Sequence, residues 1–194
     1  MTTRSQSKLK VVNLFGAPGV GKSTIAAGLF YFMKMSGISV EHVTEYAKYL
    51  VLTDRISQLE DEQLYLLAKQ HHKQHILRGR YEWAITDSPL MLCAYYAPPA
   101  TTPSKFTDLV RAYNDTFDNY NVFLTRGLEN DDTEFEEQGR LHNKEQAYRI
   151  QNEQIDFLEK MNMPFQILPI GGEDTARALM RLVLEEAALR DALK

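Results

Sequence analysis

The chain has 194 residues, of which 44% are hydrophobic and 25% are charged, with a formal net charge of −4. These proportions are typical of a soluble globular protein and exclude a disordered or fibrous chain. We expect a single domain over residues 1–194, because this length is sufficient to bury a full core. The single cysteine, Cys93, excludes an internal disulfide and a multi-cysteine metal site, and the mild acidity argues against a wide nucleic-acid-binding face.

The N-terminal ten residues, MTTRSQSKLK, are polar and lack the apolar core of a signal peptide. No apolar run elsewhere approaches the length that spans a bilayer. We therefore expect a cytoplasmic protein without a membrane partner, and we leave its oligomeric state open.

The first expected element is a strand over residues 9–15, LKVVNLF, which leads into GAPGVGKST. This segment matches G-x-x-x-x-G-K-[ST], the phosphate-binding P-loop. Its glycines let successive amides point at phosphate oxygens, and a helix beginning near Gly21 adds the positive end of its dipole. Lys22 is predicted to reach the β- and γ-phosphates and Ser23 to bind Mg²⁺. The predicted nucleotide-binding residues are Gly16, Ala17, Pro18, Gly19, Val20, Gly21, Lys22, Ser23 and Thr24.

Strands and helices alternate along the rest of the chain. Further strands are expected at residues 38–44, 81–87, 120–125 and 164–168. Further helices are expected to begin near Ser57, Ser104, Asn143 and Glu173. The alternation predicts an α/β fold with a parallel sheet covered by helices on both faces, and with ligands at the carboxyl ends of the strands.

Two acids follow expected strands. Asp87 ends the third strand, where P-loop proteins hold Mg²⁺ directly or through water, so we predict that it acts at the phosphates and shares the metal with Ser23. It could also cap a helix starting at Pro89, and the two roles are compatible. Glu45 follows the second strand, where it could accept the proton of an acceptor hydroxyl; the alternative is a solvent-facing acid in a first helical turn.

The segment at about residues 127–143 is expected to form a lid. Its residues 129–137 hold six acids and no base, which is typical of a solvated loop. Arg140 within it and Arg126 before it are predicted to stabilise the transferring phosphoryl group when the lid closes. Arg149 could equally be a surface residue of the following helix.

Other P-loop classes fit the sequence less well. A GTPase would need N-K-x-D and D-x-x-G, but residues 143–146 read NKEQ and residues 87–90 read DSPL. A motor or helicase would normally need a longer chain and a hydrophobic run ending in Asp-Glu. A non-catalytic ATP-binding regulatory protein remains an alternative.

The P-loop, the Glu in HVTEYAKYL, the Asp in AITDSPL and the Gly-Arg in EEQGRLHN together resemble the small P-loop kinases of nucleosides and nucleotides, especially their nicotinamide-riboside-kinase-like branch. The resemblance covers most of the chain. It implies a three-layer P-loop kinase fold with a five-stranded parallel sheet and a lid, ATP and Mg²⁺ as cofactors, and transfer of the γ-phosphate to a hydroxyl. The sequence departs from this pattern at two positions. Ser88 stands where many nucleoside kinases have an Arg after the third strand, and Lys48 stands where the related branch often has an Arg after its Glu. Both departures concern the acceptor rather than the phosphate site.

The same branch includes phage kinases that phosphorylate 5-hydroxymethyluridine within DNA. The resemblance makes this base the expected acceptor, and a phage-encoded chain would then act in the host cytoplasm. A free nucleoside, a nucleoside monophosphate and nicotinamide riboside are the alternatives.

Three further groups of residues have two readings each. A basic group on the second long helix could contact a DNA backbone or form a solvated face: Lys69, Lys73, Arg78 and Arg80. Tyrosines near the expected acceptor side could stack on a base or belong to the core: Tyr46, Tyr49, Tyr95 and Tyr96. Apolar residues of the same helix are expected in the core: Leu64, Leu67 and Ile76.

Overall fold

The structure, a computed structural model, describes residues 8–56, 62–126, 144–171 and 174–193. The strands in these ranges are β1 (Lys10–Phe15), β2 (Val40–Val43), β3 (Trp83–Thr86), β4 (Asp118–Arg126) and β5 (Gln166–Ile170). The helices are α1 (Lys22–Met35), α2 (Tyr46–Leu52), α4 (Gln63–His75), α5 (Met91–Tyr95), α6 (Phe106–Asn114), α7 (Lys144–Lys160) and α8 (Thr175–Ala192). Of the helices described, none has both the length and the apolar character needed to cross a membrane.

The five strands form one parallel sheet in the order β2-β3-β1-β4-β5. The expected α/β fold with a five-stranded parallel sheet is therefore confirmed. β1 lies at the centre, where Val12 pairs with Ile85 of β3 and Tyr120 of β4. Because both faces of a parallel sheet are covered, β1 reads as a nearly continuous apolar run instead of an alternating one.

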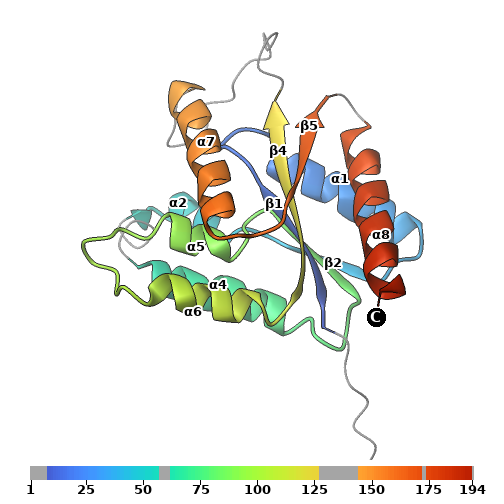
Figure 1. Cartoon of the computed structure of the whole chain (residues 1–194), viewed down its shortest axis with the longest axis horizontal. Coiled ribbons are helices and arrows are strands. Elements are labelled where there is room, and N and C mark those ends of the chain that lie inside the picture. The colour runs from blue at the N-terminus through green and yellow to red at the C-terminus, as the bar shows by residue number, and fades with distance from the viewer. Residues whose placement is uncertain (1–7, 57–61, 127–143, 172–173, 194) are drawn as a thin grey trace, which may run out of the picture.

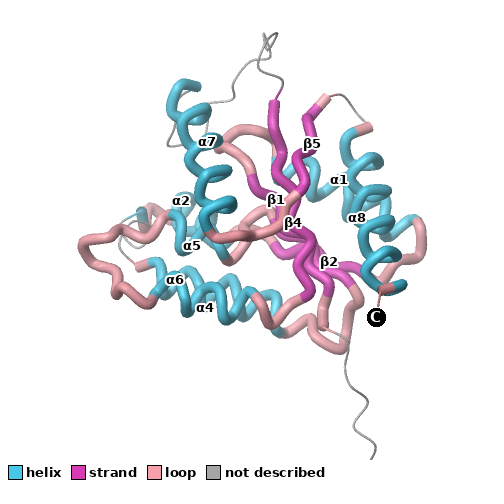
Figure 2. Tube along the Cα trace, viewed as in Figure 1, coloured by secondary structure: helices cyan, strands magenta, loops and turns pink. Residues whose placement is uncertain are grey.

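Helices cover both faces of the sheet, so that the molecule has three layers (Figures 1 and 2). One face is covered by α1 and α8, whose Leu29 and Leu179 are fully buried. These two helices approach closely at Gly28, where an added Cβ would lie 2.9 Å from the Cβ of Ala176. The other face is covered by α2, α4, α5, α6 and α7. Cys93 belongs to this second core, and burial raises the pKa of its thiol to about 12.

Several element boundaries differ from the sequence-based expectation. The helix expected at Pro89 begins at Met91, so Asp87 does not cap it. The last strand begins at Gln166 rather than Pro164, and as an edge strand paired only with β4 it tolerates Pro169 within it.

The expected core positions of α4 were partly wrong. Leu67 is buried, but Leu64 and Ile76 are 59% and 49% exposed. The buried stripe of this helix instead contains three glutamines alongside its leucines: Gln63, Gln70 and Gln74.

Candidate active site

The P-loop joins the carboxyl end of β1 to the start of α1. Its glycines Gly16, Gly19 and Gly21 have φ angles of +139°, +85° and +97°, a backbone region that residues other than glycine rarely adopt. At Gly16 an added Cβ would also lie 2.6 Å from the Leu124 carbonyl oxygen of β4. The loop is therefore held tightly against the sheet and cannot accept a side chain at its first position.

The predicted nucleotide-binding residues differ in exposure. Ala17 and Val20 are buried beneath the loop, whereas Thr24 is exposed on the first turn of α1. The Lys22 ammonium donates to the carbonyl oxygens of Gly16 and Ala17, at 2.7 and 3.0 Å. Its positive charge thus lies against the loop that would bind the phosphates.

Ser23 and Asp87 lie side by side at the carboxyl ends of the strands. β3 is the neighbour of β1, and this pairing brings Asp87 beside the first turn of α1. The Ser23 hydroxyl donates to Asp87 Oδ2 at 2.6 Å, and Asp87 Oδ1 is buried without a hydrogen-bond partner among the described residues. Mg²⁺ is bound by oxygen ligands, so the Asp87 carboxylate and the Ser23 hydroxyl together are a suitable pair of ligands for it.

Glu45 lies on the other side of Asp87, because β3 separates β2 from β1 in the sheet. It directly precedes α2 and makes no side-chain cap for this helix. Burial raises the pKa of Glu45, the positive charge of Lys22 opposes this shift, and the negative charge of Asp87 adds to it. Glu45 is thus a partly buried acid within the fields of the P-loop lysine and of Asp87, not a freely solvated one.

Helix α4 holds the segments that carry the two acids, a contribution that the sequence reading missed. Gln70 is 2% exposed; its Oε1 accepts from the Tyr46 amide at 3.2 Å, and its Nε2 donates to the Thr86 hydroxyl at 3.2 Å. It therefore links the residue after Glu45 to the residue before Asp87. Lys73, one turn later, donates to the carbonyl and hydroxyl oxygens of Thr44, at 2.8 and 3.2 Å.

Aromatic and cationic side chains gather around Tyr46, the residue after Glu45, on what we call the tyrosine–lysine surface: Tyr46, Tyr49, Tyr65, Lys69 and Lys73. The Tyr46 and Tyr49 rings are stacked at 5.6 Å, and the Tyr46 and Tyr65 hydroxyls are hydrogen-bonded at 2.8 Å. The Lys69 ammonium lies 5.3 Å from the Tyr65 ring centroid.

The basic residues of α4 and of the turn after it do not form one continuous track. Lys69 and Lys73 face the tyrosines, whereas the Arg78 guanidinium lies over the Phe117 ring at 4.4 Å and donates to Thr116. Tyr95 also differs from the other tyrosines, because its hydroxyl donates to Glu153 of α7 at 3.0 Å.

Most of the expected lid lies outside the residues that the structure describes. Arg126 is the last residue of β4, and the structure describes its backbone alone. Arg140 and the rest of residues 127–143 lie outside the described ranges. Arg149 is an exposed residue of α7 whose Nε lies 3.5 Å from Glu153 Oε1.

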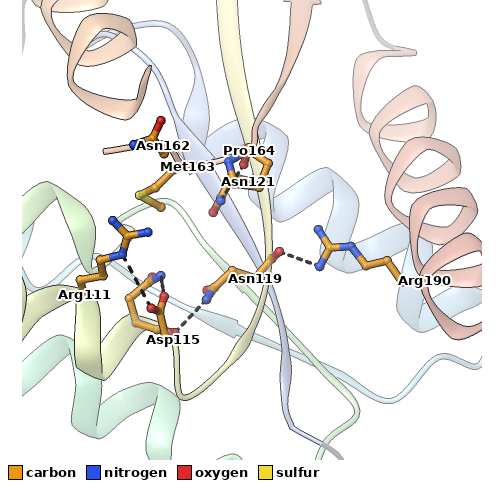
Figure 3. Close-up of a pocket in the computed structure, with 9 residues that line it drawn as sticks. Arg111, Asp115, Asn119, Asn121, Asn162, Met163, Pro164 and Arg190 are labelled. Carbon is orange, nitrogen blue, oxygen red and sulfur yellow. Dashed lines mark hydrogen bonds and ion pairs between the residues drawn. The ribbon is translucent and has the colours of Figure 1, made fainter. Parts of the chain in front are cut away.

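A separate cavity of about 430 Å³ lies at the amino ends of the strands (Figure 3). Its polar side chains already have protein partners: Arg111 donates to the Met161 carbonyl at 2.9 Å, Arg190 to Asp118 at 2.9 Å and Asn121 to the Pro164 carbonyl at 3.0 Å. None of the P-loop residues lines it. The predicted phosphate-binding residues therefore lie away from this cavity, at the carboxyl ends of the strands.

A family model described as an AAA domain matches residues 11–175, from β1 to the first residue of α8. The chain belongs to the AAA domain family. No curated protein matches the sequence significantly.

Two solved structures are similar in fold to this AAA domain. The first is thymidylate kinase from Ehrlichia chaffeensis, with 14% sequence identity and a TM-score of 0.53 over 92% of this chain and 99% of the other. The second is the NadR protein in complex with NR, with 16% identity and a TM-score of 0.60 over 91% of this chain. The chain spans about half of the NadR chain, 51%. The AAA domain therefore has the same overall fold as these two proteins.

Proposed function

We propose that this AAA domain is a kinase that transfers the γ-phosphate of ATP to a hydroxyl of a nucleoside-type acceptor. The observation that carries the proposal is the convergence of the P-loop, the Ser23–Asp87 pair and a second acid, Glu45, at one edge of the sheet. A protein that only binds ATP has no need of a proton acceptor beside its metal-binding acid. The proposed functional unit is a single domain over residues 1–194 with a lid at about 127–143.

The donor side would be formed by the P-loop. Its amides and the Lys22 ammonium would bind the phosphates of ATP, and Ser23 and Asp87 would hold Mg²⁺ directly or through water. Asp87 Oδ1 supports this fit, because it is buried and has no partner in the described part of the chain. The ion would neutralise negative charge on the phosphates. Arg126 and Arg140 are proposed to stabilise the same charge from the lid.

On the acceptor side, Glu45 is the proposed base. The acceptor oxygen attacks the γ-phosphorus, the bond from that phosphorus to the β-phosphate oxygen breaks, and the hydroxyl proton passes to the Glu45 carboxylate while ADP leaves. The raised pKa of Glu45, which results from burial, makes its carboxylate a stronger base than that of an exposed glutamate.

Within this class we propose 5-hydroxymethyluridine in DNA as the acceptor. The resemblance to the phage kinases supports it, and so does the tyrosine–lysine surface around Tyr46, because aromatic rings stack on bases and lysines attract phosphates. Arg78 is excluded from this surface by its position over Phe117.

The test is a screen with γ-labelled ATP and Mg²⁺ against nucleosides, nucleoside monophosphates, nicotinamide riboside and DNA that contains 5-hydroxymethyluridine. We expect label in the DNA, with a rate that falls steeply as salt is raised. Lys69→Glu should raise the KM for DNA, whereas Lys34→Glu, on the opposite face of the sheet, should not.

Three results would change the proposal. Faster labelling of the free nucleoside, with little dependence on salt, would exclude DNA as the acceptor and leave the kinase. Labelling of a nucleoside monophosphate or nicotinamide riboside alone would do the same. ATP binding without labelling of any acceptor would favour a non-catalytic ATP-binding protein.

A further inference from the structure

Gln154 of α7 connects the P-loop to Tyr96, the residue that follows α5. Its side chain is 1% exposed, its Oε1 accepts from the Gly16 amide at 3.4 Å, and its Nε2 donates to the Tyr96 hydroxyl at 3.3 Å. A backbone N–H can only donate, so the amide oxygen must face Gly16 and the amide nitrogen must face Tyr96. The Tyr96 oxygen is therefore the acceptor, and its own hydrogen is left to point elsewhere.

The Gly16 end of this connection has little freedom. An added Cβ at Gly16 would lie 2.6 Å from the Leu124 carbonyl oxygen and 3.0 Å from Val20 Cγ1, so the backbone is tightly enclosed. Its buried amide has Gln154 as the hydrogen-bond partner that the described structure provides. Loss of the Gln154 oxygen would leave this N–H unpaired at the base of the P-loop.

The Tyr96 end faces the Glu45 side of the site. Burial raises the pKa of the Tyr96 hydroxyl to about 12, the hydrogen bond from Gln154 opposes this shift, and the charge of Glu45 adds to it. The residue as a whole nevertheless remains 42% exposed. Tyr96 is thus a partly exposed residue whose hydroxyl is linked to the P-loop through Gln154 and lies within the field of Glu45.

Adjacent contacts keep α5 and α7 in register. The Tyr95 hydroxyl donates to Glu153 at 3.0 Å, and the Tyr95 ring lies 5.7 Å from that of Phe157. These contacts join α5 to α7 at residues 153 and 157, on either side of Gln154 in the sequence of α7.

We propose that Gln154 is a positioning residue that couples the P-loop to Tyr96, so that nucleotide binding and the placement of this tyrosine influence each other. Such coupling is reciprocal. If bound nucleotide changes the position of Tyr96, then a change in the position of Tyr96 changes the affinity for nucleotide. The assignment of Tyr96 to the acceptor side rests on the proposed function, whereas the coupling to nucleotide does not.

The first test measures the affinity of the full chain for MANT-ATP with Mg²⁺. Gln154→Leu keeps a similar volume but removes both hydrogen bonds, and we expect it to weaken binding by about tenfold. Gln154→Glu should stay within about threefold of the wild type, because a carboxyl group can accept from Gly16 and either accept from or donate to Tyr96. Gln74→Leu is the matched control, since Gln74 is also buried but its Nε2 has no partner in the described ranges.

The second test is a double-mutant cycle. Tyr96→Phe should weaken MANT-ATP binding by about threefold in the wild type and have no effect when combined with Gln154→Leu, because Tyr96 acts through Gln154. Wild-type affinity in Gln154→Leu, or an equal effect of Tyr96→Phe in both backgrounds, would overturn the proposal. If Gln154 acted through packing alone, the order of the two variants would be reversed, and Gln154→Leu would bind MANT-ATP more tightly than Gln154→Glu.

If Gln154→Leu does not fold, Gln154→Glu and Tyr96→Phe are sufficient: near wild-type affinity in the former and weaker binding in the latter support the coupling, and the reverse overturns it. Nucleotide binding without phosphate transfer would disprove the proposed kinase and leave this result intact.

Discussion

Replacement of Asp87 by asparagine removes a negative charge from the site while nearly preserving the shape of the side chain. The asparagine oxygen can still accept from Ser23, which donates to Asp87 Oδ2 at 2.6 Å in the wild type. A neutral amide binds Mg²⁺ far less well than a carboxylate, so we expect Mg²⁺-dependent turnover to fall by about 100-fold or more.

Folding stability should change little in this variant. The carboxylate is 5% exposed and its Oδ1 has no partner in the described part of the chain, so its burial carries a cost that the amide reduces. The loss of attraction to nearby cations acts in the opposite direction; one of these is Lys73, on which the charge of Asp87 acts. Each effect is about 1–3 kcal/mol and they oppose each other, so the free energy of unfolding should stay within about 2 kcal/mol of the wild type.

The assay is turnover as a function of Mg²⁺ concentration, combined with urea unfolding in the absence of nucleotide and metal. Asp118→Asn is the control: Asp118 lies at the opposite end of the sheet, where its Oδ1 accepts from Arg190 at 2.9 Å. This control should lose about 1 kcal/mol of stability and keep its turnover. Wild-type turnover in Asp87→Asn, or a loss of several kcal/mol of stability, would refute the reasoning.

Three other changes have distinct expected outcomes. Lys22→Ala should lower turnover by about 100-fold or more, since it removes the charge facing the phosphates, and unchanged turnover in a kinetic assay would contradict the mechanism. Glu45→Gln should slow transfer and raise the Tm at pH 7, because burial raises the pKa of Glu45 and makes its ionised form costly; melting curves should lose this gain once acid protonates Glu45 in the wild type, and a gain that persists in acid would be inconsistent with that cause. Gly28→Ala should destabilise the fold by about 1–3 kcal/mol through contact with Ala176, and Ala176→Gly should restore stability in urea unfolding unless the contact is unimportant.

Local patterns predicted the fold well. The P-loop is a contiguous motif between a strand and a helix, and each expected strand overlaps one in the sheet. The carboxyl ends of neighbouring parallel strands lie at one edge, so the closeness of Asp87 and Glu45 to the P-loop followed from their places after strands. Their catalytic roles remain predictions.

Contacts between distant helices were not predictable in the same way. Gln70 and Gln154 are polar helix residues that no sequence motif singles out, yet each is buried and hydrogen-bonded to backbone or hydroxyl groups of two other segments. On α4 the buried face includes Gln70, whereas Leu64 of this helix and Ile76, its C-cap, are exposed. The separation of Arg78 from Lys69 likewise depends on which neighbour each side chain meets.

The central claim is that the γ-phosphate is transferred to an organic hydroxyl. It is tested most directly by ³¹P NMR of ATP and Mg²⁺ with the acceptor panel, comparing the wild type with Lys22→Ala. We predict that the wild type forms a phosphomonoester in step with ADP for one acceptor class and that Lys22→Ala forms neither. Inorganic phosphate as the sole product with every acceptor, or no consumption of bound ATP, would contradict the claim.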